Sequence, residues 1–355
     1  MSALSQQAIQ IKSSLGSYSV RFGDSQSVAS QIPLSMLIVD DHFRRFPQFH
    51  TNNVVWLTAT ETNKTLASVE RVINNLRELG ATKRHHLVAV GGGVVQDVST
   101  LVSSLYMRGV NWHYVPTTLL GMVDSCIGGK SSINTVATKN LIGNIYPPKS
   151  VLIDCGLTSS LPPRDVYSGL AEALKIAYCG GERSFRRMLP LLNQFKPEHL
   201  PEIVHLSLMT KKWFVEVDEF DVAERLQLNF GHTFGHAIEI SSNFTIPHGL
   251  AVAAGMICAA RYGEIFGNNV GHARELEAAS GSILRSGLAS VDRVSFDNDM
   301  FLSAFRSDKK HPQGGFRLVL PSHSTGVQLM EVDRSEQTEK RVLQIVTSVV
   351  KEFMS

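Results

Sequence analysis

Cysteines, long apolar runs and an excess of one charge sign are all scarce in this sequence. The four cysteines are scattered through 355 residues without a Cys-X-X-Cys pair, which argues against a disulfide framework and is typical of reduced cytosolic thiols. Lysine and arginine number 34 against 32 aspartates and glutamates, a formal net charge of +2. This balance gives no reason to expect a nucleic acid or an anionic membrane as a partner.

Signals for a membrane or for export are missing as well. The most apolar run, Gly249 to Ala260, is about twelve residues long, whereas a membrane-spanning helix needs about 20. The first residues, MSALSQQAIQIKSS, contain no basic segment followed by an apolar one, so nothing indicates a signal peptide. We therefore expect a soluble, cytoplasmic protein.

Two widespread site motifs are also absent. Gly91-Gly-Gly93 follows an apolar run but does not extend to Gly-X-Gly-X-X-Gly, so it does not by itself establish the usual Rossmann order. His232 and His236 enclose Thr-Phe-Gly without a glutamate. That spacing excludes the His-Glu-X-X-His motif of zinc proteases.

The sequence does contain a clear change of pattern near its middle. Up to residue 155, short apolar runs alternate with helical spacings, which predicts a parallel sheet covered by helices. Alternation over 8–23 predicts a hairpin with its turn near 13–16. From Pro162 onward helical periods dominate. We expect a Rossmann-like α/β domain over 1–160 and an all-α domain over 161–355, in a chain long enough for two domains.

The segment from Arg225 to Gly249 is a candidate metal site. If it is helical, His232 and His236 share one face, and His248 follows Pro247, where the chain turns back. A catalytic zinc ion takes three protein ligands and leaves one position open, so three imidazoles would suffice. The alternative is that the helical histidines are core residues bonded to the backbone.

Glu172 and Lys175 extend this candidate site. They are spaced i, i+3 in a segment whose other residues are mostly apolar or small. An exposed ion pair is the alternative, but little polar helix surface is left, and a buried carboxylate needs a cation. Glu172 is therefore a candidate third or fourth metal ligand. Further cations at Lys211 and Arg225 suit a small polyol that carries phosphate or carboxylate.

Two loops of the first half are candidates for binding anions. Gly91-Gly-Gly93 precedes a helix, and residues without side chains at a helix N-terminus let the backbone approach a pyrophosphate. A tight turn is the alternative. Asp124, Lys130, Lys139 and Asn140 flank a loop rich in glycine and serine. Its lysines would clamp phosphate or carboxylate, unless they are merely solvated.

Together these motifs resemble the 3-dehydroquinate synthases and, more broadly, the sugar phosphate cyclases. The resemblance runs from about Glu61 to Pro321 and rests on the order and spacing of the motifs. They include GGGVVQD (91–97), VPTTLL (115–120), VDSCIGGK (123–130), KNLIG (139–143), LAEALK (170–175), RLQLNFGHTFGHAIE (225–239) and PHGLAVAAGM (247–256). The resemblance implies an N-terminal domain that binds NAD and a C-terminal helical domain that binds metal and substrate.

The resemblance also implies roles for single residues. The ligands of Zn²⁺ (or Co²⁺) become Glu172, His232 and His248, so that His236 moves from the metal to the substrate. The substrate positions are Asp124, Lys130, Asn140, Lys175, Lys211, Arg225, Asn229 and His236, with Lys309 or Lys310. The NAD positions are Asp41, Glu61, Lys64, Gly92, Gly93, Val94, Asp97, Thr117, Thr118, Lys130, Lys139, Leu157 and Ser160. Arg108 matches an arginine that reaches a neighbouring subunit's site, which implies a homodimer.

The reaction implied by the resemblance turns 3-deoxy-D-arabino-heptulosonate 7-phosphate into 3-dehydroquinate and phosphate. NAD oxidises the C5 hydroxyl transiently, the resulting ketone acidifies the neighbouring C–H so that phosphate leaves, and NADH returns the hydride before the ring opens and closes as a carbocycle. The metal would hold the C4 and C5 hydroxyls. Alternatives are a cyclase of the amino-dehydroquinate or sedoheptulose 7-phosphate type, or a metal-dependent polyol dehydrogenase.

The chain also departs from the family pattern. Phe43 stands where an asparagine is expected, Gln96, Ser99 and Thr100 replace Gly, Ala and Gly, and Leu250 replaces a glutamate. We interpret these changes as marks of a divergent branch. Lys211 and Arg225 nevertheless favour the 3-dehydroquinate reaction, because they suit a substrate carboxylate that neutral sugar phosphates lack.

Overall fold

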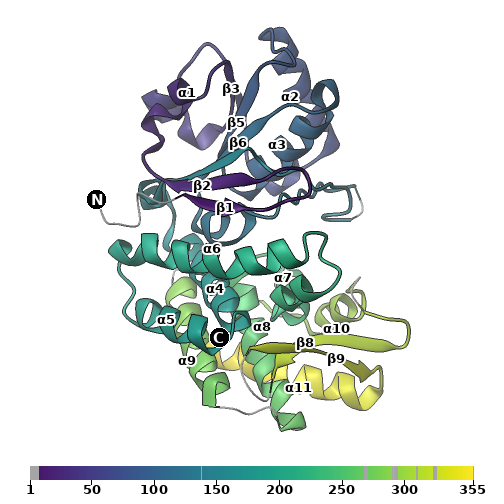
Figure 1. Cartoon of the computed structure of the whole chain (residues 1–355). Coiled ribbons are helices and arrows are strands. Elements are labelled where there is room, and N and C mark those ends of the chain that lie inside the picture. Colours follow the sequence, from purple (N-terminus) through teal and green to yellow (C-terminus); the bar gives the residue numbers. More distant parts are fainter. Residues whose placement is uncertain are drawn as a thin grey trace. The chain divides into compact units, whose positions relative to one another are not determined.

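The computed structural model describes residues 8–136, 138–267, 271–289, 291, 295–308, 311–322 and 326–354. The chain divides into two compact units, Met1–Ser160 and Leu161–Ser355. The first is an α/β unit and the second is mostly helical, as predicted (Figure 1).

A seven-stranded sheet forms the centre of the first unit. Its order is β1-β2-β7-β6-β5-β3-β4, in which the β1–β2 pair is antiparallel and the other pairs are parallel. The predicted N-terminal hairpin is confirmed, and the Gly16 amide closes its turn by donating to the Ser13 carbonyl at 3.1 Å. The strands are β1 (Ile9–Ile11), β2 (Tyr18–Phe22), β3 (Ser35–Asp40), β4 (Val54–Leu57), β5 (His86–Gly91), β6 (Trp112–Pro116) and β7 (Ser150–Ile153).

Strand order fixes where a ligand can bind on this sheet. From β3 the chain moves outward to β4 and then returns to the other side of β3 to form β5. In open parallel sheets, ligands bind beyond the carboxyl ends of the strands at such a reversal. Helices α1 (Val28–Gln31), α2 (Leu66–Glu78) and α3 (Gly93–Leu105) belong to this unit, and α3 begins directly after β5 and packs on β5 and β6. Its N-terminus therefore lies at the reversal.

Eight helices and a two-stranded hairpin make up the second unit in the part of the chain that the structure describes. The sequence prediction missed the hairpin and α10, because α10 has only nine residues and the alternation in β9 includes the exposed Leu329. The helices are α4 (Pro163–Cys179), α5 (Glu182–Asn193), α6 (Leu200–Val217), α7 (His232–Ser241), α8 (His248–Gly263), α9 (Gly271–Leu288), α10 (Asn298–Arg306) and α11 (Glu336–Phe353). The strands are β8 (Gly315–Pro321) and β9 (Val327–Asp333).

Helix α8 is the core of this unit. It contacts α4, α7, α9, α11 and β8, and all its residues except His248 and Arg261 are buried. By length and composition alone, His248–Phe266 is the one described segment that could cross a membrane, but 78% of it is buried in the protein. Small residues bring its neighbours close, since a Cβ on Gly255 would lie 2.0 Å from the Gly231 carbonyl oxygen.

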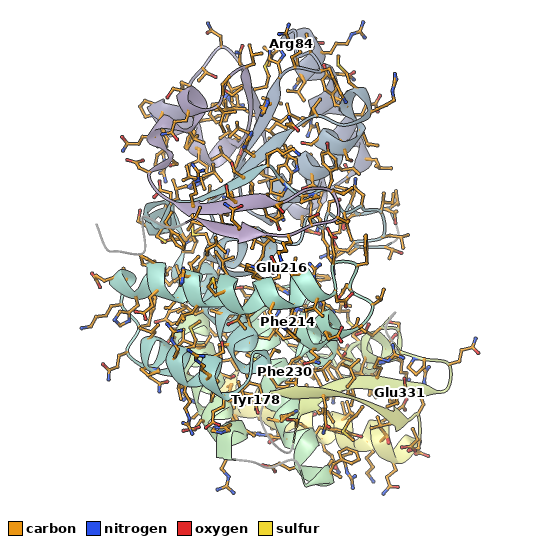
Figure 2. All side chains as sticks on the ribbon, viewed as in Figure 1. Arg84, Tyr178, Phe214, Glu216, Phe230 and Glu331 are labelled. Carbon is orange, nitrogen blue, oxygen red and sulfur yellow. The ribbon has the colours of Figure 1, made fainter. Side chains whose placement is uncertain are left out.

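The segment before α7 is fixed to α4 by aromatic packing. Phe230 stacks on Tyr178 with ring centroids 5.4 Å apart and planes 18° apart, and both lie in the core of the helical unit (Figure 2). Stacked aromatic pairs of this kind contribute about 0.5–1.5 kcal/mol beyond the area they bury. The start of α7, which carries His232, is thereby held against α4.

A chain of polar side chains crosses three strands of the sheet and makes stability depend on pH. His86 and His113 face each other at 2.9 Å, and the other ring nitrogen of His113 lies 2.7 Å from the Ser150 hydroxyl. Burial, with the nearby charges of His86 and Lys149, lowers the pKa of His113 from 6.5 to about 4. Between these two pH values the His113 ring is therefore neutral in the folded protein and protonated in the unfolded chain.

We expect the free energy of unfolding to fall as the pH drops from about 6.5 to 4. The unfolded chain binds the proton first over this window, which costs up to about 3 kcal/mol for a shift of this size. Urea unfolding of the parent and of His113→Gln at several pH values would measure the difference. His113→Gln should lose stability less steeply, and equal slopes for the two proteins would contradict the assignment.

Candidate active site

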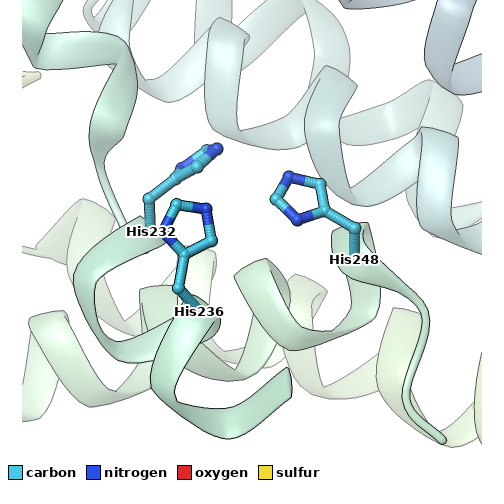
Figure 3. Close-up of side chains that lie close together, drawn as sticks. All are labelled: His232, His236 and His248. Atoms are coloured by element: carbon cyan, nitrogen blue, oxygen red, sulfur yellow. The ribbon is translucent and has the colours of Figure 1, made fainter. Parts of the chain in front are cut away.

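Three histidines from two helices meet in the second unit. His232 is the first residue of α7, His236 lies one turn later, and His248 is the first residue of α8. Each offers a ring nitrogen, and these atoms all lie within 4.8 Å of one another. Figure 3 shows the rings pointing toward a common space. The two ligand histidines predicted with Glu172 are thus neighbours, and so is His236.

Glu172 of α4 faces the same place. Its side chain has no exposed surface, and its Oε1 lies 3.8 Å from His232 Nε2 and 3.6 Å from His248 Nε2. Its Oε2 forms an ion pair with the ammonium of Lys175 at 2.5 Å, and Lys175 is 2% exposed. An exposed surface pair, which the sequence left open, is therefore excluded.

The Glu172 carboxylate fits a divalent metal ion. Oε1 accepts no hydrogen bond from any residue that the structure describes, and a buried carboxylate oxygen without a partner is costly. Ligand atoms of a tetrahedral ion with bonds of about 2.0–2.1 Å lie about 3.3 Å apart. The two observed Nε2–Oε1 separations are close to that value, so one ion could satisfy all three groups.

The second ring nitrogen of each ligand histidine is also held. Nδ1 of His232 donates to the Phe230 carbonyl at 3.2 Å, and Nδ1 of His248 lies 2.9 Å from Oε2 of Glu239. Burial lowers the pKa of His248, but the hydrogen bond to Glu239 and the charges of Glu239 and Glu172 outweigh this effect and raise it overall. Glu239 is a residue that the sequence analysis did not single out as part of the site.

Close backbone packing sets the distance between α4 and α8. The Gly249 amide donates to the Ser168 hydroxyl at 2.9 Å, and a Cβ on Gly249 would lie only 2.0 Å from the Ser168 carbonyl oxygen. Glycine is therefore required directly after His248. Leu250, which departs from the family pattern, is fully buried and packs against Gly287.

The predicted substrate residues of the second unit lie on neighbouring segments. Lys211 of α6 is 5% exposed. Arg225 and Asn229 lie in the 3-10 segment Glu224–Asn229, which directly precedes α7. The Asp218 carboxylate accepts the Val222, Ala223 and Arg225 amides, and these bonds outweigh its burial and lower its pKa. Lys309 and Lys310 lie outside the described residues.

In the first unit, the predicted NAD residues follow the carboxyl ends of parallel strands. Gly92 is the N-cap of α3 and has no side chain that could cap the first amides of the helix, which suits a site for pyrophosphate. Thr118 lies so close to Gly92 that a Cβ there would approach its methyl group to 2.9 Å. The residues follow β3 (Asp41), β4 (Glu61, Lys64), β5 (Gly92, Gly93, Val94, Asp97), β6 (Thr117, Thr118) and β7 (Leu157, Ser160).

A polar network around the buried Lys64 side chain joins three of the predicted residues of this unit. The Lys64 ammonium lies 2.6 Å from the Asp97 carboxylate and donates to the Asn140 side-chain oxygen at 2.6 Å. Burial raises the pKa of Asp97, and Lys64 and hydrogen bonds from Ser132 counter it. Asn140 has a positive φ of 54°, and its amide donates to Asn134, which in turn donates to Glu61. Ser132 and Asn134 were not predicted.

Asp124 lies in a single turn of π-helix, Gly121–Ser125, a distortion that is frequent at functional sites. Buried Gln96 holds this turn from α3: its amide donates to the Ser125 carbonyl at 2.6 Å and its side-chain oxygen accepts from the Ser125 hydroxyl at 2.5 Å. Gln96, which departs from the family pattern, therefore ties the start of α3, where Asp97 lies, to the turn that carries Asp124. Lys130 and Lys139 lie in the following loop, at 127–149.

Comparison with known proteins shows the family of this chain. The profile described as 3-dehydroquinate synthase N-terminal matches residues 54–168, and the profile described as 3-dehydroquinate synthase C-terminal matches residues 169–311. The chain belongs to the 3-dehydroquinate synthase family. A 3-dehydroquinate synthase of Xylella fastidiosa (strain M23) is 36% identical to it over 286 residues, which cover 78% of this chain and 76% of that protein.

Solved structures of other sugar phosphate cyclases share the family's fold. A 2-deoxy-scyllo-inosose synthase complexed with carbaglucose-6-phosphate, NAD⁺ and Co²⁺ is 25% identical, with a TM-score of 0.82 over 96% of this chain and 99% of that one. A 2-epi-5-epi-valiolone synthase from Streptomyces hygroscopicus subsp. jinggangensis 5008, with NAD⁺ and Zn²⁺ bound, is 23% identical, with a TM-score of 0.79 over 97% and 99%. The latter likeness is one of fold.

Gly249→Ala tests whether backbone packing positions His248. The added methyl group would push α8 away from Ser168, so we expect a loss of about 1–3 kcal/mol in the free energy of unfolding together with weaker Zn²⁺ binding. Urea unfolding and chelator competition measure the two effects. Gly315→Ala is the matched control, because its Cβ would meet nothing closer than 3.2 Å. Unchanged metal affinity in Gly249→Ala would contradict the interpretation.

Proposed function

We propose that this chain converts 3-deoxy-D-arabino-heptulosonate 7-phosphate into 3-dehydroquinate and phosphate, as a carbon–oxygen lyase that uses NAD and a divalent metal ion. The observation that carries the proposal is the buried Glu172 carboxylate. One of its oxygens faces the Nε2 atoms of His232 and His248, and the other pairs with Lys175. This arrangement occurs in a chain that belongs to the 3-dehydroquinate synthase family.

The residues present fit both cofactors. Glu172, His232 and His248 would hold Zn²⁺ or Co²⁺, the ions named for the two solved cyclases. The turn at Gly92, the N-terminus of α3 and the Lys64–Asp97 pair would hold NAD. When bound, NAD accepts and returns the hydride, and the metal lowers the pKa of the hydroxyl that is oxidised.

The chain's own polar side chains would bind and orient the substrate. Lys175 lies beside the metal ligands and is fixed by Glu172. Lys211 and Arg225 are buried cations that suit the substrate carboxylate, and charge-assisted hydrogen bonds of this kind are strong. Lys130 and Asn140 would bind the phosphate. The remaining substrate positions are Asp124, Asn229, His236 and one of Lys309 and Lys310.

A cyclase for a neutral sugar phosphate is the second candidate. The fold likeness to the synthase complexed with carbaglucose-6-phosphate favours it. Against it, the buried side chains of Lys211 and Arg225, which are 5% and 4% exposed, suit the carboxylate of the acid substrate, and a neutral sugar phosphate has no such group.

Arg108 suggests a dimer. It is the exposed last residue of the 3-10 segment Tyr106–Arg108, it follows the exposed Met107, and its φ is positive, at 63°. Strained exposed residues of this kind persist at functional positions. We propose a homodimer in which Arg108 reaches the partner's site, in a cytoplasmic enzyme that binds neither nucleic acid nor membrane.

The purified protein should release phosphate from the heptulosonate phosphate when NAD and Zn²⁺ are present. NADH should not accumulate, because the hydride returns within each turnover. A phosphate assay, NADH fluorescence and product mass spectrometry on a panel of sugar phosphates measure this. No release from the heptulosonate phosphate would contradict the proposal, and release from a neutral sugar phosphate in its place would establish the second candidate. Stoichiometric NADH would indicate a dehydrogenase.

Two adjacent lysines supply a matched comparison within the same assay. Lys211→Met should lower kcat/KM about 10- to 100-fold, the equivalent of a charge-assisted hydrogen bond of about 1.5–3 kcal/mol. Lys212→Met should remain near the parent, because Lys212 pairs with Glu216 on the same helix. Equal effects of the two substitutions would argue against a substrate contact at Lys211.

A further inference from the structure

Glu239 links the two helices that carry the metal-ligand histidines. It lies seven residues after His232 on α7, and its carboxylate reaches across to His248, the first residue of α8. The distance from Glu239 Oε2 to His248 Nδ1 is 2.9 Å. One helix therefore contributes a ligand, His232, and also a partner for the ligand on the other helix.

The acceptors around the two histidines assign their tautomers. A carbonyl oxygen can only accept, so His232 carries its hydrogen on Nδ1, toward Phe230. A carboxylate likewise accepts, so His248 carries its hydrogen on Nδ1, toward Glu239. In both rings Nε2 is then the nitrogen left for a metal ion, and it lies 3.8 Å and 3.6 Å from Oε1 of Glu172.

His248 depends on its partner more than His232 does. The side chain of His248 is 35% exposed, against 12% for His232, so surrounding atoms restrict its ring less. The Glu239 side chain is 17% exposed, and this largely buried carboxylate supplies the restraint. Carboxylates that accept from the second nitrogen of a ligand histidine fix the ring and make it a stronger ligand.

We propose that Glu239 is a positioning residue that holds the His248 ring in the orientation and tautomer needed for the metal, and so sets the metal affinity of the site. The inference rests on the proposed metal site and goes beyond it, because Glu239 would act on the metal only through His248.

Metal affinity of the purified protein without substrate tests the proposal. We expect Glu239→Ala to weaken Zn²⁺ and Co²⁺ binding about 10- to 100-fold, measured by competition with a chelator. Glu239→Gln keeps an oxygen that accepts from Nδ1–H and should recover part of the loss. The absorption bands of bound Co²⁺ should shift in Glu239→Ala, because the ring is no longer fixed.

Glu277→Ala is the matched control. Glu277 is another partly buried glutamate of the helical unit, but it pairs with Arg261 at the far end of α8. Its removal should lower the thermal stability and leave the metal affinity within about twofold of the parent. The proposal is overturned if Glu239→Ala binds metal as tightly as the parent, if Glu277→Ala loses as much affinity, or if the parent binds no metal.

This experiment separates the role of Glu239 from the proposed reaction. If Glu239→Ala loses metal affinity while the parent, loaded with metal and NAD, releases no phosphate from the heptulosonate phosphate, the reaction is wrong and the role of Glu239 stands. If the parent releases phosphate and Glu239→Ala binds metal normally, the reaction stands and the role of Glu239 is wrong.

Discussion

The buried ion pair between Glu172 and Lys175 is the constraint on which the helical unit depends. Burying two charges costs several kcal/mol per ion, and apolar residues of similar size often stabilise a protein as well or better. Here the pair lies in the middle of α4, where almost every neighbour is apolar. Lys175 neutralises one carboxylate oxygen and leaves the other facing two imidazoles. A metal ion bound at the second carboxylate oxygen would explain why the protein keeps a buried carboxylate that costs stability.

The backbone arrangement brings the histidines to that carboxylate. His232 and His248 are both first residues of helices, so the places where α7 and α8 begin fix both ligands. Gly249 allows α8 to approach α4, and Gly255 allows it to approach the residue before α7. Each glycine contact is with a backbone oxygen, which cannot move aside as a flexible side chain could. The ligand positions are therefore set by the packing of α8.

Local patterns in the sequence predicted the parts of this protein that local physics determines. The N-terminal hairpin, the alternation of strands and helices up to residue 155 and the Glu172–Lys175 spacing all follow from periodicity. Gln96, Asn134 and Glu239 could not be found in this way, because their partners lie 29, 73 and nine residues away and come together through the fold. The β8–β9 hairpin was missed because the alternation in β9 includes the exposed Leu329. The resemblance to a family supplied the residue roles that no pattern could.

The central claim is that Glu172, and not His236, completes the metal site with His232 and His248. The three histidines alone are close enough to hold an ion, so geometry permits both ligand sets. The most direct measurement is a crystal structure of the Zn²⁺-loaded protein with anomalous data at the zinc edge. The account predicts one carboxylate oxygen of Glu172 and the Nε2 atoms of His232 and His248 within about 2.2 Å of the ion. An ion bound by three imidazoles, with Glu172 paired only to Lys175, would contradict it.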